Sequence, residues 1–325
     1  MANRLFRAGV WLLLLGMSVA QAEPLATSAS GAVTPYGAQR MGDEAHGIPI
    51  WQGDKPERTT LASRLLKEKP LYTIDQHNLK QHQQYLAVGM QALFDAYPES
   101  MRLPVYPSHR YAYYPQWVYD AIAKNKQSAR LIDGGNSLVD AWPGIPFPKP
   151  KNGYQVLWNH LMAFKGGYIQ LNFVETTINP GQNYSLIRNR LKLYCNYYDP
   201  ERAPSKADDM YVYYLSEATY PPKIAGGALL VHERINPSRI PRQAWSYLSG
   251  QRKVMRVPSI DYDSPMRGSE AIRFADEVDI YNGSIDRYKW TLEGKQNLIV
   301  PYNNEHLERV IGVLGIFRPK RTKTL

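Results

Sequence analysis

The sequence predicts an α+β protein, with helices in its first half and a twisted antiparallel sheet in its second half. In residues 73–165, apolar side chains recur at helical spacing in three segments. From Tyr168 the apolar period changes to two, with Ile169, Leu171 and Phe173 alternating with polar residues. Further segments of this kind follow closely, bounded by Gly, Pro, Asn or Asp, and this spacing is typical of a meander of neighbouring strands.

The composition is that of a globular protein. The chain has 325 residues, of which 44% are hydrophobic, so it can bury a large core as one β-rich domain or as two smaller ones. It is basic, with 39 Lys and Arg against 29 Asp and Glu. The 24 Tyr and 7 Trp favour sheet surfaces and amphipathic linings, where a ring packs while its polar tip stays hydrated.

The first 22 residues have the three parts of a secretory signal peptide. Arg4 and Arg7 precede an apolar run at residues 10–15, and Ala20-Gln21-Ala22 forms a cleavage site of small residues. The apolar run is too short to cross a bilayer. We therefore predict that residues 1–22 are removed and that the mature chain is periplasmic. The alternative is an uncleaved anchor.

Three helices are predicted before the sheet. The first lies between the N-cap candidates Thr73 and Asp75 and the terminating Pro98, and its single apolar stripe is expected to cover the sheet. Two more are predicted within residues 116–124 and 152–165, the second ending before two glycines.

Two stretches are expected to be irregular. Residues 23–70 are rich in Pro, Gly, Ser and Thr, which predicts an extended segment whose residues 47–51 pack on the body. Residues 98–150 alternate aromatic residues with prolines outside the short helix, which predicts edges, turns and loops.

Ten strand segments are predicted. They cover residues 168–173, 184–188, 191–194, 210–215, 228–234, 245–248, 254–257, 278–281, 288–290 and 297–302. Residues 249–251 form a short Gly-containing link that predicts a hairpin. Alternation places Trp245 and Tyr247 on one face of its first strand, and Met255 and Arg256 on opposite faces of its second. No residue of this hairpin is reactive, which favours binding over catalysis.

Motifs for catalysis or metal binding are absent from the sequence. There is no Gly-rich phosphate loop, no G-x-S-x-G, no H-E-x-x-H and no C-x-x-C, so we expect no enzyme activity, cofactor or metal. The one cysteine, Cys195, is expected to be a small apolar strand residue. Asp261, Asp263 and the acidic turn at residues 276–279 keep an enzyme as an alternative, although ordinary turns also favour Asp.

Two basic clusters are candidates for holding an anionic group. They are Ser108-His109-Arg110, and Arg252-Lys253 with Arg256 and Arg267. A capped loop and a solvated sheet face are the simpler interpretations. Basic residues among aromatic ones also occur in nucleic-acid-binding proteins. Because an exported protein meets anionic lipids instead, we expect no nucleic acid and allow for peripheral contact with a membrane.

Six stretches are distinctive in combination. They are GIPIW at 47–51, VYPSHR at 105–110, YPQWVY at 114–119, GIPFPKPKNG at 144–153, WNH at 158–160 and GQRKV at 250–254. Together they resemble DUF1329, a family of exported Gram-negative proteins often described as outer-membrane lipoprotein-sorting proteins. Ser249 departs from the family pattern, which has a proline there.

The resemblance implies an incomplete, strongly curved antiparallel β-barrel, a half-barrel like those of the LolA and LolB carriers, with helices covering its concave face. This domain would span residues 71–304, after the extended segment at 23–70, and residues 305–325 would form a basic divergent tail. Family members continue into further strands, so a truncation or frame shift near residue 304 is expected. The resemblance also implies an outer-membrane or export-complex protein as partner.

We therefore expect a carrier that binds a lipid, an acyl chain or lipoprotein-like cargo in outer-membrane transport. The side chains expected to line the apolar ligand together are Tyr211, Tyr213, Leu229, Val231, Trp245 and Tyr247. Those expected to hold an anionic head group at the rim are His109, Arg110, Arg252 and Arg256. The alternatives are an interaction subunit of an export complex without a small ligand, and an enzyme acting on an envelope lipid or polysaccharide near Asp261 and Asp263 or His109.

Overall fold

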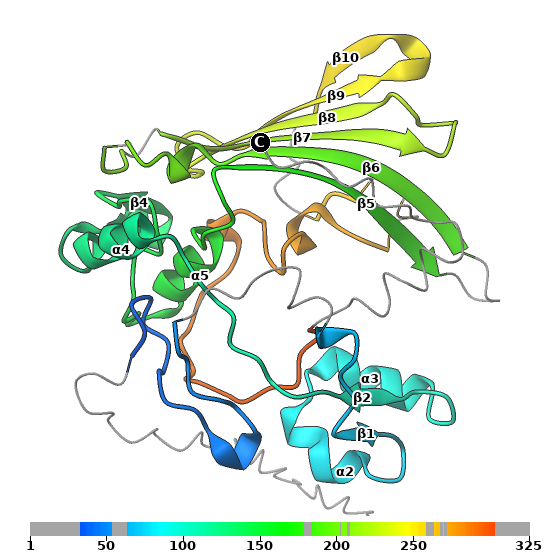
Figure 1. Cartoon of the computed structure of the whole chain (residues 1–325). Helices are drawn as coiled ribbons and strands as arrows, with labels where there is room; N and C mark the ends of the chain where they lie inside the picture. The colour runs from blue at the N-terminus through cyan, green and yellow to red at the C-terminus, as the bar shows by residue number, and fades with distance from the viewer. Residues whose placement is uncertain are drawn as a thin grey trace, which may run out of the picture.

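A six-stranded antiparallel sheet dominates the structure, a computed structural model that describes residues 33–53, 64–178, 184–201, 203–206, 209–257, 263–266, 269 and 272–302. Its strands are β5 (Tyr168–Ile178), β6 (Tyr184–Tyr194), β7 (Met210–Tyr220), β8 (Ala228–Arg234), β9 (Gln243–Leu248) and β10 (Lys253–Arg256). They pair in sequence order, so the sheet is a meander. It stays open, with β5 and β10 at its edges (Figure 1). The predicted α+β class is confirmed.

The hairpin between β9 and β10 forms where the sequence predicts it. Residues Ser249–Gln251 make one 3-10 turn, and Arg252 takes a left-handed conformation with φ of 51° to start β10. Val254 pairs with Tyr247, and Arg256 pairs with Trp245. The sheet is interrupted by register shifts in β6, between Arg188 and Asn189, and at the start of β7.

The three strands predicted after residue 275 are wrong. The described chain from residue 272 to 302, here called the C-terminal segment, contains two 3-10 turns (Ala275–Glu277 and Ile285–Arg287) and no strand. Asp279 and Ile280 have φ of 56° and 73°, values that a strand cannot accommodate. Its aromatic residues pack against one another instead of alternating across a sheet, with the Tyr281 and Trp290 rings 4.8 Å apart.

Two of the three predicted helices form, and the first is broken. The confirmed helices are α4 (Gln116–Ser128) and α5 (Gly153–Leu161), which begins where the Asn152 side chain accepts a hydrogen bond from Gln155 N. The broken one consists of α2 (Leu79–His82), a 3-10 turn (Gln83–Tyr85) and α3 (Val88–Ala96). Leu86, between them, has an extended backbone and a buried side chain.

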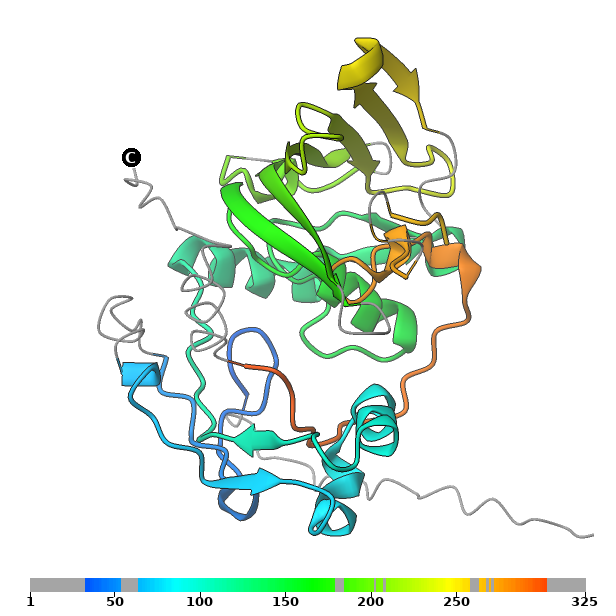
Figure 2. The ribbon, with the colours of Figure 1, turned by 90° about the vertical axis from the view of Figure 1, so that its right-hand side faces the viewer.

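The broken helix was predicted to cover the large sheet, and this prediction is wrong. It packs instead on a small sheet of β1 (Tyr72–Ile74) and β2 (Leu103–Val105), in a cluster centred on Ile74, Leu86 and Phe94. Figure 2 shows this small lobe at the bottom of the molecule, with the C-terminal segment running down to it. Ile299 joins the lobe's apolar cluster, and its N–H donates to the Tyr85 carbonyl at 2.8 Å.

The main core lies under the large sheet. Helix α5 contributes Trp158, and β7 contributes Val212. A second cluster contains Val118 and Ile122 of α4. The short hairpin of β3 (Arg130–Ile132) and β4 (Ser137–Val139) follows α4, and its Leu138 belongs to the main core. Within the stretch 47–51, which is expected to pack on the body, Trp51 is 6% exposed and donates to the Ala112 carbonyl, whereas Ile50 is 46% exposed. Among the described residues, no helix has the length and apolar character needed to cross a membrane.

Replacing Gly153 with alanine is expected to loosen the C-terminal segment. A Cβ at Gly153 would collide with the backbone of Trp290 and Thr291, because α5 and the segment touch there. We expect a loss of about 1–3 kcal/mol of stability, measured by urea unfolding, and faster proteolysis within the segment. The matched control is Gly89→Ala in α3, where a Cβ meets nothing. Equal stability of the two variants would contradict the close contact.

Cys195 is expected to resist alkylation in the folded protein. Its side chain is buried, and this burial raises the pKa of its thiol to about 11. Only about one thiol in a thousand is then ionised at pH 8, and only the thiolate reacts with iodoacetamide. The rate, followed by mass spectrometry, should rise about tenfold per pH unit while the fold persists. Native alkylation as fast as in urea would show that Cys195 is accessible.

Candidate functional site

The two faces of the large sheet differ in what they contact. The inner face meets the main core and the C-terminal segment: Leu193 and Val212 pack with the core, and Glu175 pairs with Arg273 at 2.9 Å. Figure 1 shows the sheet arching over this side, with β5 and β6 curving toward the chain beneath. The outer face points away from the rest of the molecule (Figures 1 and 2).

The six predicted lining residues do not share one face, so that expectation is wrong. In the register of β8 with β9, Leu230 lies opposite Trp245 and Ala228 lies opposite Tyr247. Paired residues point to the same side, so Trp245 and Tyr247 lie on the opposite face from Leu229 and Val231. A difference of one residue in register exchanges the two faces, and the sequence does not reveal register.

The same register assigns each lining candidate to a side. Tyr213 pairs with His232, on the face of Leu230, and therefore lies outside with Trp245 and Tyr247. Leu229 and Val231 lie inside. Tyr211 lies at the register shift in β7 and packs against the main core. Burial and the nearby Glu233 carboxylate raise the pKa of Tyr211, so it is a neutral phenol.

A half-exposed apolar strip crosses the inner face beside the core. The residues that line up across all six strands are Leu171, Leu191, Ser216, Leu229, Ser246 and Met255. Leu171 is 38% exposed and Met255 is 46% exposed, while Leu191 and Leu229 are partly buried. Ser216 and Ser246 separate the larger side chains of the strip. Sequence reasoning missed most of this strip, although the alternation in each strand contained the signal once register is known.

Charged groups border the strip toward the far end of β5. Glu175 lies on the inner face two rows from Leu171 and pairs with Arg273 of the C-terminal segment. Burial raises the pKa of the nearby Tyr214 hydroxyl, which is therefore neutral and able to donate a hydrogen bond. Polar groups therefore lie beside the strip on the inner face.

The predicted head-group residues do not come together. His109 and Arg110 lie before α4, against the N-terminal part of the chain and not at the rim of the sheet. His109 Nε2 lies 2.6 Å from the Glu68 carboxylate. Arg252 occupies the β9–β10 turn, and Arg256 lies on the outer face opposite Trp245. A single head-group site built from these four residues is therefore wrong.

Removing the Arg110 guanidinium is expected to release residues 33–53. The acceptors of its N–H groups are the carbonyls of Gln39, Arg40, Met41 and Pro49. A guanidinium offers five N–H donors in a fixed fork, which a lysine ammonium cannot reproduce. Arg110→Lys should therefore release residues 33–53 nearly as much as Arg110→Ala does. We expect faster amide hydrogen exchange at residues 39–51 in both variants, with the β5–β10 sheet unchanged. Wild-type protection in Arg110→Ala would contradict this role.

Two of the carboxylates proposed as an enzyme alternative form ion pairs with basic side chains. Asp263 pairs with Arg287 at 3.1 Å, and Asp279 pairs with Lys165. Asp261 and Arg267 lie outside the described residues, as do the predicted signal peptide at 1–22 and the tail at 305–325. Within the described part of the chain, no group of three or more His, Cys, Asp and Glu side chains is arranged to hold a metal ion.

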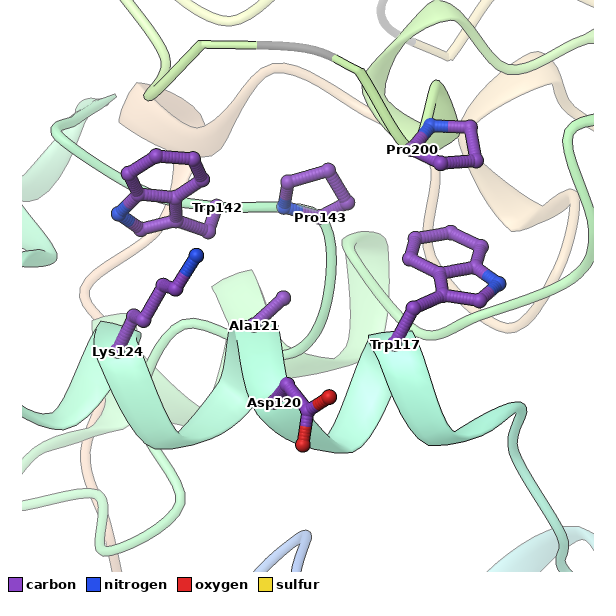
Figure 3. Close-up of a pocket in the computed structure, with 7 residues that line it drawn as sticks. All are labelled: Trp117, Asp120, Ala121, Lys124, Trp142, Pro143 and Pro200. Atoms are coloured by element: carbon purple, nitrogen blue, oxygen red, sulfur yellow. The ribbon is translucent and has the colours of Figure 1, made fainter.

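A small hollow lies along α4 (Figure 3). Its volume is about 190 Å³, and its lining residues are Trp117, Asp120, Ala121, Lys124, Trp142, Pro143 and Pro200. Lys124 Nζ lies 4.2 Å from the Trp142 ring centroid, a cation–π contact that already occupies one face of that ring. The hollow is smaller than the roughly 300–1,000 Å³ of typical small-molecule sites. The inner strip is the better candidate for an elongated ligand.

Comparison with known proteins identifies the family. The sequence profile described as "Protein of unknown function (DUF1329)" matches residues 73–312. The chain belongs to the DUF1329 family. Uncharacterized protein PA3922 of Pseudomonas aeruginosa is 35% identical in an alignment of 311 residues that covers 91% of this chain and 66% of that protein. This DUF1329 chain thus spans just under two thirds of the length of that relative.

Two solved structures overlap part of this DUF1329 chain. A domain from Vibrio parahaemolyticus, described as an outer membrane lipoprotein-sorting protein, is 19% identical, with 42% of this chain and 50% of that chain covered and a TM-score of 0.29. A DUF1329 protein from Desulfovibrio piger is 22% identical, with 40% and 48% covered and a TM-score of 0.27. Both overlaps cover less than half of this chain.

Proposed function

We propose that this DUF1329 protein binds an apolar ligand, a lipid or an acyl chain, on the inner face of its open sheet and carries it within the cell envelope. The observation that supports this most is the half-exposed strip containing Leu171, Leu191 and Leu229 beside the main core. An apolar row on the sheltered side of a sheet offers a ligand a surface that water solvates poorly.

Burial of the ligand supplies the binding free energy in this proposal. Each methylene moved from water into an apolar site contributes about 0.8 kcal/mol, so a long acyl chain binds without any reactive group. Glu175, Arg273 and the Tyr214 hydroxyl offer hydrogen bonds to a polar end of the ligand. The predicted signal peptide, residues 1–22, would deliver this carrier to the periplasm, and an outer-membrane or export-complex protein would be its partner.

Ligand binding is tested with a pair of matched variants. Leu171 on the inner face and Leu215 on the outer face are 38% and 37% exposed, and both lie in neighbouring parts of the same sheet. We expect Leu171→Asp to weaken binding of a fluorescent fatty-acid analogue about tenfold or more, because a carboxylate would have to be desolvated. Leu215→Asp should bind as the wild type does. Equal affinities, or no binding by the wild type, would overturn the inner-face site.

A second measurement identifies the native cargo. The full chain is purified from the periplasm without detergent and extracted with organic solvent, and the extract is analysed by mass spectrometry. A stoichiometric lipid that is depleted in Leu171→Asp but retained in Leu215→Asp is the expected result. A well-folded protein that is empty in every preparation would argue against a carrier.

A further inference from the structure

An exposed row of aromatic rings crosses the outer face of the sheet, on the side opposite the proposed ligand strip. The ring centroids of Tyr194 and Tyr213 are 6.2 Å apart, those of Tyr213 and His232 are 4.8 Å apart, and those of His232 and Trp245 are 4.9 Å apart. Tyr168 pairs with Tyr194 and extends the row to the edge strand β5. The row therefore runs across five strands, from β5 to β9.

These rings are not part of the core. Tyr168 is 58% exposed, Tyr194 is 45% exposed and Tyr213 is 36% exposed. The inner face already supplies the packing residues of the sheet, such as Val212 and Val231. Leaving neighbouring rings in water forgoes the free energy of their burial, and a contiguous exposed patch of this kind marks a contact surface.

The same face is strongly basic. Its charged residues, by alternation and register within the described strands, are Arg188, Arg190, Lys192, Arg234, Arg256 and Glu217. Glu217 is the single acid among them and pairs with Arg190 at 3.3 Å. Lys192 is exposed in the row next to the rings, and Arg256 is exposed opposite Trp245. Positive charge therefore borders the aromatic row on β6 and at its β9 end.

We infer that the outer face of the sheet docks on a membrane surface that contains anionic lipids. Tyrosine and tryptophan prefer the boundary between head groups and acyl chains, because the ring is apolar and its tip is polar. Lysine and arginine next to them pair with lipid phosphates. The outer face of the sheet arches away from the rest of the described molecule (Figure 1).

The membrane inference is independent of the carrier proposal, because the two use opposite faces of the sheet. It is tested by co-sedimentation with vesicles of phosphatidylcholine alone and of phosphatidylcholine with phosphatidylglycerol. We expect binding to the phosphatidylglycerol vesicles only, weakening as salt is added. Lys192→Gln and Arg256→Gln should each weaken it about fivefold. Equal binding to vesicles with and without phosphatidylglycerol would overturn the inference, and so would binding that neither substitution weakens.

The contribution of the rings is tested separately. Tyr194→Ser combined with Tyr213→Ser is expected to weaken vesicle binding about tenfold or more, whereas Tyr97→Ser, 58% exposed at the end of α3, should leave it unchanged. Lipids brominated on their acyl chains should quench the tryptophan fluorescence of the wild type more than that of Trp245→Tyr. This variant keeps an aromatic ring at position 245 but lacks the indole. Circular dichroism confirms that each variant is folded. Equal binding by the double variant and Tyr97→Ser would refute the docking face.

Discussion

Replacing Arg242 with methionine is expected to lower the free energy of unfolding by about 3–5 kcal/mol. Arg242 pairs with Glu233 of β8, and the two side chains are only 7% and 11% exposed. Its guanidinium also donates to the carbonyl and side-chain oxygens of Asn282 at 2.7 and 3.0 Å. Methionine fills similar space but leaves the Glu233 carboxylate buried without this cation, which accounts for most of the expected loss.

The control is the double variant Arg242→Met with Glu233→Met. Removing both charges avoids an uncompensated buried carboxylate, so we expect the double variant to regain most of the lost stability. Urea unfolding followed by tryptophan fluorescence measures all three proteins. If the double variant were no more stable than Arg242→Met, the ion pair would not be the source of the effect. Because Asn282 belongs to the C-terminal segment, proteolysis there should also speed up in the single variant.

Replacing Trp158 with alanine is expected to cost about 3–5 kcal/mol, the usual range for deleting a buried aromatic side chain. Trp158 is 2% exposed at the centre of the main core, and its indole N–H donates to the Gly135 carbonyl at 2.9 Å. It is the largest fully buried side chain of α5, so its loss leaves a cavity between the helix and the sheet.

Two variants separate packing from hydrogen bonding at this position. Trp158→Phe keeps most of the ring contacts but leaves the Gly135 carbonyl without its donor, and we expect it to cost about 1–3 kcal/mol. Val156→Ala, on the exposed side of the same helix, should change stability by no more than about 0.5 kcal/mol. If the Trp158→Ala variant had the same unfolding temperature as the Val156→Ala variant, α5 would not anchor the sheet. Calorimetry gives the three values.

The strands of the large sheet follow from local patterns in the sequence. Alternation from Tyr168 onward predicts β5, and residues 249–251 predict the hairpin between β9 and β10. Such features need only the conformational preferences of neighbouring residues. Family membership also follows from the sequence, since short stretches such as GIPFPKPKNG are distinctive together and the family profile matches most of the chain.

Three features depend on contacts between distant residues. The helix predicted after Asp75 breaks at Leu86, because that side chain is buried with Ile74 and Phe94 instead of continuing a helical stripe. The aromatic segments after residue 275 look like strands, yet they pack on one another and on α5. Periodicity alone does not distinguish a strand from an extended segment held by tertiary contacts.

In the candidate site, too, some features follow from the local sequence and others depend on contacts between distant residues. The sequence alone determined that this chain has an antiparallel meander with apolar and aromatic alternation, because alternation is a property of each strand by itself. Only the tertiary structure decided which half of each alternation is inside. Register pairs Trp245 with Leu230, and it places the tyrosine row outside and the leucine strip inside. A shift of one residue would exchange these two surfaces, and the register is selected by the packing of the whole sheet on its core.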